Sequence, residues 1–130
     1  MSSIVLDASA LLALLRSEVG SDIVTAALPH AVISSVNYAE VLEKTLERGG
    51  RSEAVAHFIR TLAIPIIPFD EDQAAAVADL HAQTKQEKLS FAALACLALA
   101  SLRRAKLITA DQVMGRVQRP VKVRLIRHGL

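Results

Sequence analysis

Two apolar, strand-like stretches of this chain, residues 4–7 and 106–111, each end in an aspartate, Asp7 and Asp111. If they are neighbouring strands of a parallel sheet, both carboxylates lie at its C-terminal edge, where open α/β sheets form their sites. A third acid, Glu40, falls in the first turns of a predicted helix. Clustered oxygen ligands suit a hard cation such as Mg²⁺ or Mn²⁺. The spacing therefore predicts a divalent metal site.

Each acid also has a purely structural interpretation. Asp111 alone could cap a helix, and Glu40 alone could be a surface glutamate. All three acids, however, lie in otherwise apolar stretches, where an unpaired carboxylate is costly. Taken together, they favour the metal site.

The rest of the chain alternates strand-like and helix-like segments, which predicts βαβ units. Besides the two aspartate strands, strands are predicted over residues 31–34, 64–69 and 121–126. Helices are predicted over residues 10–15, 21–28, 36–48, 52–62, 71–84 and 91–102, with caps at Ser9, Asp70 and Ser90 for the first, fifth and sixth. No state is assigned to residues 112–119. The fold class is α/β, with a mostly parallel sheet of about four to five strands flanked by helices on both faces.

The composition predicts one domain with an aliphatic core. The chain has 130 residues, of which 52% are apolar and only 3% aromatic, and we expect residues 1–130 to form a single domain. A small domain has much surface for its volume, so an apolar excess indicates that another chain covers part of it. We therefore expect an oligomer or a tight partner.

Charge is distributed unevenly, although the net charge is only +2. The C-terminal third is basic around the single acid Asp111, a pattern that suits a polyanion such as a nucleic acid. A solvated basic face is the alternative interpretation. The basic residues are Arg103, Arg104, Lys106, Arg116, Arg119, Lys122, Arg124 and Arg127.

Several classes of protein are excluded by what the sequence lacks. One cysteine, Cys96, allows neither an internal disulfide nor a cysteine zinc site, and favours a reducing, intracellular compartment. No signal peptide is predicted, and the apolar run over residues 91–102 is shorter than the roughly 18–20 residues that span a bilayer. There is no glycine-rich phosphate loop, which argues against nucleotide binding by that route, and there is no HExxH histidine pair.

Four segments together resemble the PIN domain, specifically the VapC ribonuclease toxins of bacterial toxin–antitoxin pairs. They are residues 5–12, 37–41, 89–98 and 109–111, in the order and spacing of that family. The resemblance covers essentially the whole chain. It implies a PIN-like fold, an Mg²⁺- or Mn²⁺-dependent endoribonuclease acting on RNA in the cytoplasm, a homodimer, and a cognate antitoxin as partner.

The resemblance also implies roles for individual residues. Asp7 and Glu40 are metal ligands, and Asp111 is the remaining ligand or orients water. Ser9 and Thr109 supply hydroxyls that hold the carboxylates in place. Basic residues close to Asp111 in sequence could hold the RNA backbone; these are Arg116 and Arg119.

The chain departs from the family pattern at one position. An aspartate is normal near the start of the third motif, in the pattern Leu-Ser-x-x-Asp, and here the matching residue is Ala93. Alanine provides neither ligand nor charge, so the endoribonuclease is expected to be silenced. Either an aspartate was altered to silence an active toxin, or this member has lost activity; the intact surrounding motif favours alteration. If Ala93 is natural, the alternative is a non-catalytic module that binds an antitoxin, acts in autoregulation and cuts nothing.

Overall fold

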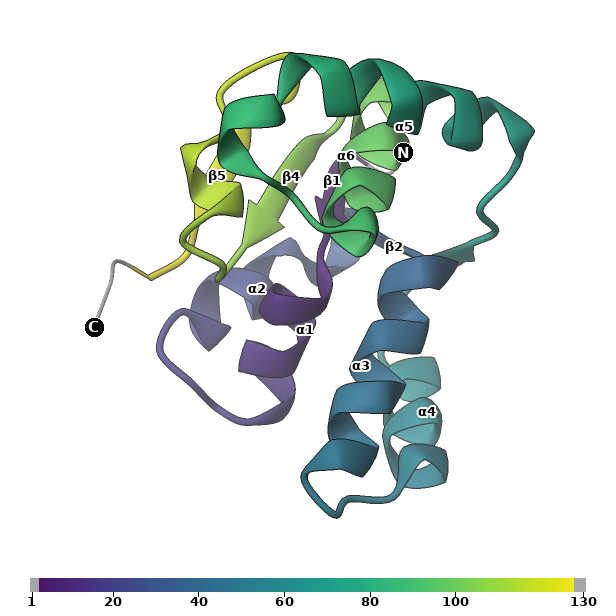
Figure 1. The fold of residues 1–130 in the computed structure, drawn as a ribbon. Helices are drawn as coiled ribbons and strands as arrows, with labels where there is room; N and C mark the ends of the chain where they lie inside the picture. The colour runs from purple at the N-terminus through teal and green to yellow at the C-terminus, as the bar shows by residue number, and fades with distance from the viewer. Residues whose placement is uncertain (1–2, 128–130) are drawn as a thin grey trace.

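The computed structural model describes residues 3–127 and has a central sheet with helices on both faces (Figure 1). The strands are β1 (Ile4–Leu6), β2 (Ala31–Ser34), β3 (Ile66–Ile67), β4 (Lys106–Thr109) and β5 (Val123–Leu125). The helices are α1 (Ala8–Leu15), α2 (Ser21–Ala27), α3 (Ser35–Glu47), α4 (Ser52–Thr61), α5 (Glu71–Gln83) and α6 (Phe91–Arg103). Single 3₁₀ turns are η1 (Leu28–His30), η2 (Lys85–Glu87) and η3 (Met114–Arg116).

The five strands are all parallel, in the order β3-β2-β1-β4-β5. In the central strand β1, Leu6 lies beside Ile33 of β2 and Ile108 of β4. The chain leaves β1 towards β2 and β3 and then crosses to β4 on the other side. The C-terminal ends of β1 and β4 therefore flank the point where the strand order reverses, which is where open α/β sheets bind ligands. This confirms the α/β fold and the predicted pairing of the two aspartate strands.

Alternate residues of the strands face two separate cores. Leu6 and Ile33 pack with apolar residues of α1 to α4 on one face. Val5 and Val32 pack against α5 and α6 on the other, where Leu97 is fully buried. Burial on both faces explains why β1 and β2 are continuous runs of mostly apolar residues, whereas the edge strand β5 alternates around the exposed Arg124.

The cap of α1 differs from the prediction. Asp7, not Ser9, begins the helix: its backbone is extended, and its Oδ1 accepts a hydrogen bond of 2.9 Å from the amide of Ala10. The reason is that α1 starts at Ala8, directly after the strand, so that the strand-ending aspartate is already at the capping position. The caps predicted at Asp70 and Ser90 are confirmed.

The strand ends and the last loop also refine the prediction. β3 is a two-residue strand at the sheet edge, as expected for a segment that carries Pro65 and Pro68. β4 ends at Thr109, so Asp111 lies two residues beyond the strand. The unassigned residues 112–119 contain η3. Within residues 3–127, no helix combines the length and the hydropathy required to cross a bilayer.

Candidate active site

A small cleft of about 50 Å³ opens at the C-terminal ends of β1 and β4. It brings together all three predicted acids and the alanine of the third motif, although they come from four separate parts of the chain. Arg116 and Arg119 are exposed, but they are not among the residues that line the cleft. The lining residues are Asp7, Ala8, Ser9, Asn37, Glu40, Lys44, Ser90, Ala93 and Asp111.

Three helix starts build the walls of this cleft. Asp7 forms the start of α1, and Ala93 is the third residue of α6. α3 begins directly after β2 because Ser34 caps it, accepting a hydrogen bond of 3.2 Å from the amide of Val36. Glu40 is therefore in the second turn of α3. Helix N-termini carry partial positive charge, so this edge of the sheet favours anionic side chains and anionic ligands.

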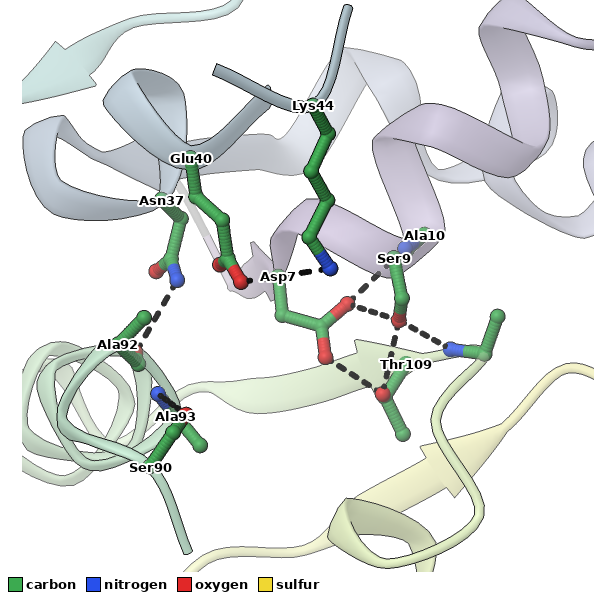
Figure 2. Close-up of polar contacts among 11 residues, drawn as sticks. Asp7, Ser9, Ala10, Asn37, Glu40, Lys44, Ser90, Ala92, Ala93 and Thr109 are labelled. Carbon is green, nitrogen blue, oxygen red and sulfur yellow. Dashed lines mark hydrogen bonds and ion pairs between the residues drawn. The ribbon is translucent and has the colours of Figure 1, made fainter. Parts of the chain in front are cut away.

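Asp7 is the central side chain of the cleft, and the residue is only 6% exposed (Figure 2). Ser9 Oγ donates to Asp7 Oδ1 over 2.7 Å, and the amide of Ala10 donates to the same oxygen. Thr109 Oγ1 donates to Asp7 Oδ2. Three donors from two elements thus hold the carboxylate in one orientation.

Burial raises the pKa of Asp7 from its ordinary value of 3.8 to about 6. Desolvation is the largest cause, and the negative charge of Asp111 adds to it. The hydrogen bonds from Thr109, Ser9 and Ala10 lower the pKa but do not offset the burial. The charged carboxylate is therefore destabilised in this fold, and a cation in the cleft would stabilise it.

The two hydroxyls also connect Asp7 to the loop that carries Asp111. Ser9 Oγ accepts a hydrogen bond of 2.8 Å from the amide of Ala110, and Thr109 Oγ1 accepts one of 2.9 Å from the amide of Asp111. Each hydroxyl thus donates to one oxygen of Asp7 and accepts from the β4 loop. The role of Ser9 and Thr109 in holding the acids for catalysis stays a prediction.

Thr109→Val is expected to lower the free energy of unfolding by about 1–3 kcal/mol, because it leaves a buried carboxylate oxygen and a backbone amide without partners. Thr109→Ser keeps the hydroxyl and is the matched control. Urea unfolding of both variants at pH 7 measures the difference. Equal destabilisation by valine and serine would show that the hydroxyl does not support Asp7.

Glu40 approaches the cleft together with a lysine that the sequence analysis missed. Lys44 Nζ is 3.6 Å from Glu40 Oε2, and Figure 2 draws this ion pair beside Asp7 without a contact between Lys44 and Asp7. Lys44 lies four residues after Glu40, on the same helix face, and that spacing is the signal that could have identified it. This ion pair is partly exposed, with side-chain exposures of 47% for Lys44 and 27% for Glu40.

Asn37 is the second residue that the sequence analysis missed. It lies three residues before Glu40, is 1% exposed, and donates from Nδ2 to the backbone oxygen of Ala92 over 3.1 Å. This bond ties α3 to the first turn of α6 and sets the distance between the Glu40 and Ala93 walls. Asn37 Oδ1 has no hydrogen-bond partner among the described residues.

Asp111 is exposed at the rim of the cleft. Its Oδ1 accepts hydrogen bonds from the amides of Val113, at 2.8 Å, and Met114, at 3.4 Å. The side chain therefore starts the turn that leads into η3, as its structural interpretation predicted, while it also contributes negative charge to the cleft. The two roles are compatible.

The cleft has the kind of donor atoms that a divalent cation requires, but too few of them lie close together. Three carboxylates line it, and the most buried of them, Asp7, forms no salt bridge within residues 3–127. In residues 3–127, however, no group of three or more His, Cys, Asp or Glu side chains lies close enough together to hold a metal ion. Ala93 contributes only a methyl group to the wall where a fourth carboxylate would face the others.

Comparisons with known proteins agree with this architecture. Residues 4–120 match the family model for the PIN domain. A search of curated proteins found no match.

Several solved structures have the same fold. A toxin–antitoxin complex from Klebsiella pneumoniae matches with a TM-score of 0.75 and 22% identity, covering 96% of this chain and 98% of that one. DNA-bound VapBC from Salmonella typhimurium matches with a TM-score of 0.76 and 12% identity, covering 98% and 100%. FitAcB from Neisseria gonorrhoeae matches with a TM-score of 0.67 and 23% identity, covering 92% and 95%. At these identities the similarity establishes the fold.

Proposed function

The chain belongs to the PIN-domain family, as its four motifs predicted, and on this premise we propose that it is a metal-dependent endoribonuclease of the VapC toxin type, silenced by Ala93. One observation carries the proposal. Asp7, Glu40 and Asp111 line a single cleft at the switch point of the sheet, with Ala93 on the wall where the family has its remaining acid. The substrate would be RNA, and the reaction hydrolysis of a phosphodiester bond.

The residues of the chain would prepare the cleft for this reaction. Thr109 and Ser9 fix the orientation of Asp7, so that both of its oxygens keep their directions when a ligand enters. Asn37 keeps α3 against α6, and so keeps Glu40 opposite position 93. Pre-organised groups of this kind need no rearrangement as charge develops on the phosphate.

With an aspartate at position 93, the cation would be held by that residue together with Asp7, Glu40 and Asp111. When bound, Mg²⁺ or Mn²⁺ supplies Lewis acidity, which lowers the pKa of water and offsets negative charge on the phosphate. The raised pKa of Asp7 supports this proposal, because a carboxylate that is destabilised by burial gains most from a nearby cation.

We propose a cognate antitoxin and a second copy of the chain as partners, and the cytoplasm as the compartment. The antitoxin is supported by the complexes with the same fold, which are described as toxin–antitoxin and VapBC assemblies. Exposed apolar side chains on the α3–α4 pair suit a covered surface, with Leu46 at 58% exposure and Phe58 at 43%.

A second candidate function follows from Ala93 itself. If the alanine is natural, the chain would be a non-catalytic module that binds an antitoxin and takes part in autoregulation. The lack of a three-ligand group within residues 3–127 favours this candidate for the chain in its present form. Restoring the acid separates the two functions, because only a silenced enzyme would regain cleavage.

The test is cleavage of total cellular RNA in Mg²⁺, in Mn²⁺ and in EDTA. Ala93→Asp is expected to cut in either metal but not in EDTA, and Ala93→Asp combined with Asp7→Ala is expected to be inactive. Cutting that survives Asp7→Ala would place the activity outside this cleft. No cutting by Ala93→Asp, even on structured RNA, would favour the binding module.

A further inference from the structure

A wider groove of about 370 Å³ lies beside the acidic cleft. We call it the basic groove, because four of its lining residues are cationic. It shares Ser9 and Lys44 with the cleft, so the two are continuous. The lining residues that matter here are Ser9, Arg16, Lys44, Glu47, Arg48 and Arg127.

Helix periodicity explains why these side chains face one groove. Ser9 and Arg16 are seven residues apart and lie on one face of α1 and its C-terminal cap. Lys44 and Arg48 are four residues apart and lie on the face of α3 that also carries Glu40. α1 and α3 pack together in the same core, and each begins at the cleft. The groove therefore leads away from the cleft, and the helical rise puts Arg48 about 12 Å beyond Glu40.

Ion pairing leaves two guanidinium groups of the groove available. Arg127 Nη1 pairs with Glu18 Oε1 over 3.1 Å, and Lys44 pairs with Glu40. Arg16 and Arg48 form no salt bridge with any residue of the described range 3–127. Glu47 is one acid beside them. The groove thus keeps a positive excess at the place where it leaves the cleft.

We propose that the basic groove binds the phosphates of the RNA strand next to the bond that the cleft would cut, a proposal that rests on the function proposed above. One guanidinium group can form two parallel hydrogen bonds to the oxygens of a phosphate, which suits Arg16 and Arg48 to this ligand. No aromatic side chain lines the groove among the described residues. It therefore offers backbone contacts rather than stacked bases, and holds RNA without reading its sequence.

An RNA strand fits these observations better than an acidic peptide. A phosphodiester in the cleft is joined covalently to its neighbours, so the next phosphates must leave along an adjoining surface. Of the cationic residues in the groove, Lys44 belongs to both spaces and lies where the strand would pass from one to the other. Arg16 and Arg48 both lie at helix C-termini, where the helix dipole stabilises positive charge, and this accounts for a basic residue at each position. It does not explain why both line the same groove.

The test is equilibrium binding of a short fluorescein-labelled single-stranded RNA by anisotropy, in EDTA, with the chain as it is. Arg16→Gln combined with Arg48→Gln is expected to weaken binding about tenfold or more at low salt. The slope of log K against log salt should fall in magnitude by about 1.4, since each phosphate that an arginine neutralises contributes about 0.7. The matched control, Arg60→Gln with Lys85→Gln, removes two exposed charges that line neither the groove nor the cleft and should leave the slope unchanged.

Four results would overturn the proposal. One is an absence of RNA binding, and another is an unchanged slope in the Arg16 and Arg48 double variant. The third is a poly-glutamate probe that binds as tightly as the RNA and is weakened as much in that variant, because the groove would then suit an acidic protein segment. Weaker binding seen instead with Arg116→Gln and Arg119→Gln would assign the RNA to the arginines near Asp111. Cleavage by Ala93→Asp is scored separately, so either proposal can fail alone.

Discussion

Ala93→Asp is expected to raise the affinity of the cleft for Mn²⁺ about a hundredfold. The new carboxylate would lie in the first turn of α6, where the helix N-terminus stabilises negative charge, and would face Asp7 across the cleft. Adding one charge at ligand distance from a divalent ion contributes a few kcal/mol, at an effective dielectric constant of about 20. At about 1.4 kcal/mol per tenfold, this corresponds to roughly two orders of magnitude. Isothermal titration calorimetry measures it.

Two control variants separate a ligand from a general charge effect. Ala93→Asn has nearly the shape of aspartate without its charge. Ala92→Asp adds the same charge to the same turn, but residue 92 does not line the cleft. We expect both to bind Mn²⁺ far more weakly than Ala93→Asp. An equal gain from Ala92→Asp would mean that the cation responds to the surrounding field rather than to a completed ligand set.

Asp7→Asn is expected to stabilise the metal-free protein by roughly 3 kcal/mol at pH 7, which corresponds to the rise of the Asp7 pKa from 3.8 to about 6. In the folded state the Asp7 carboxyl keeps its proton to a higher pH than in the unfolded state. The parent chain therefore loses stability as the pH rises from about 4 to about 6, whereas the asparagine variant does not. The gain should be complete above pH 6 and disappear below pH 4.

Urea unfolding in EDTA at pH 4 and pH 7 measures this gain. The matched control is Asp79→Asn, a change at an exposed position of α5, and we expect its effect to stay within about 0.5 kcal/mol at both pH values. A destabilising Asp7→Asn at pH 7 would mean that the hydrogen bonds from Ser9 and Thr109 outweigh the burial of the charge. The acid would then be structural, and a cation in the cleft would lack its main support.

The sheet and the convergence of the acids could be predicted because they depend on local patterns. Apolar runs that end in Asp7 and Asp111 mark strand ends, and parallel strands bring such ends to one edge. The caps at Asp70 and Ser90 follow from residue type and position alone. The strand ends and the caps need no knowledge of distant contacts, whereas the pairing of β1 with β4 is a long-range condition that the structure confirms.

Other features depend on contacts between distant segments and could not be predicted. The four-residue spacing predicts that Lys44 lies beside Glu40 on one helix face, but only the packing of α3 against α1 places this pair in the cleft. Asn37 reads as a polar helix residue, but its amide holds Ala92, 55 positions later. Residue type alone also suits Ser9 to a cap, and only the start of α1 at Ala8 assigns the cap to Asp7.

The two arginines close to Asp111 in sequence also show that proximity in sequence does not predict which residues line the cleft. Arg116 and Arg119 are close to this acid in sequence, but Asp111 accepts hydrogen bonds from Val113 and Met114 and so starts a turn. Neither arginine lines the cleft. Arg16 and Arg48, which are far from Asp111 in sequence, line the basic groove that continues from the cleft. That RNA is bound at either place remains a prediction.

The most direct test of the account is the single-turnover rate of RNA cleavage by this chain and by Ala93→Asp, side by side in the same Mn²⁺ concentration. The account predicts a rate for Ala93→Asp at least about a hundredfold above that of the present chain, because only the variant has the complete acidic cleft. Equal rates would contradict it. If both rates were high and depended on Asp7, three acids would be sufficient and Ala93 would not be a silencing residue.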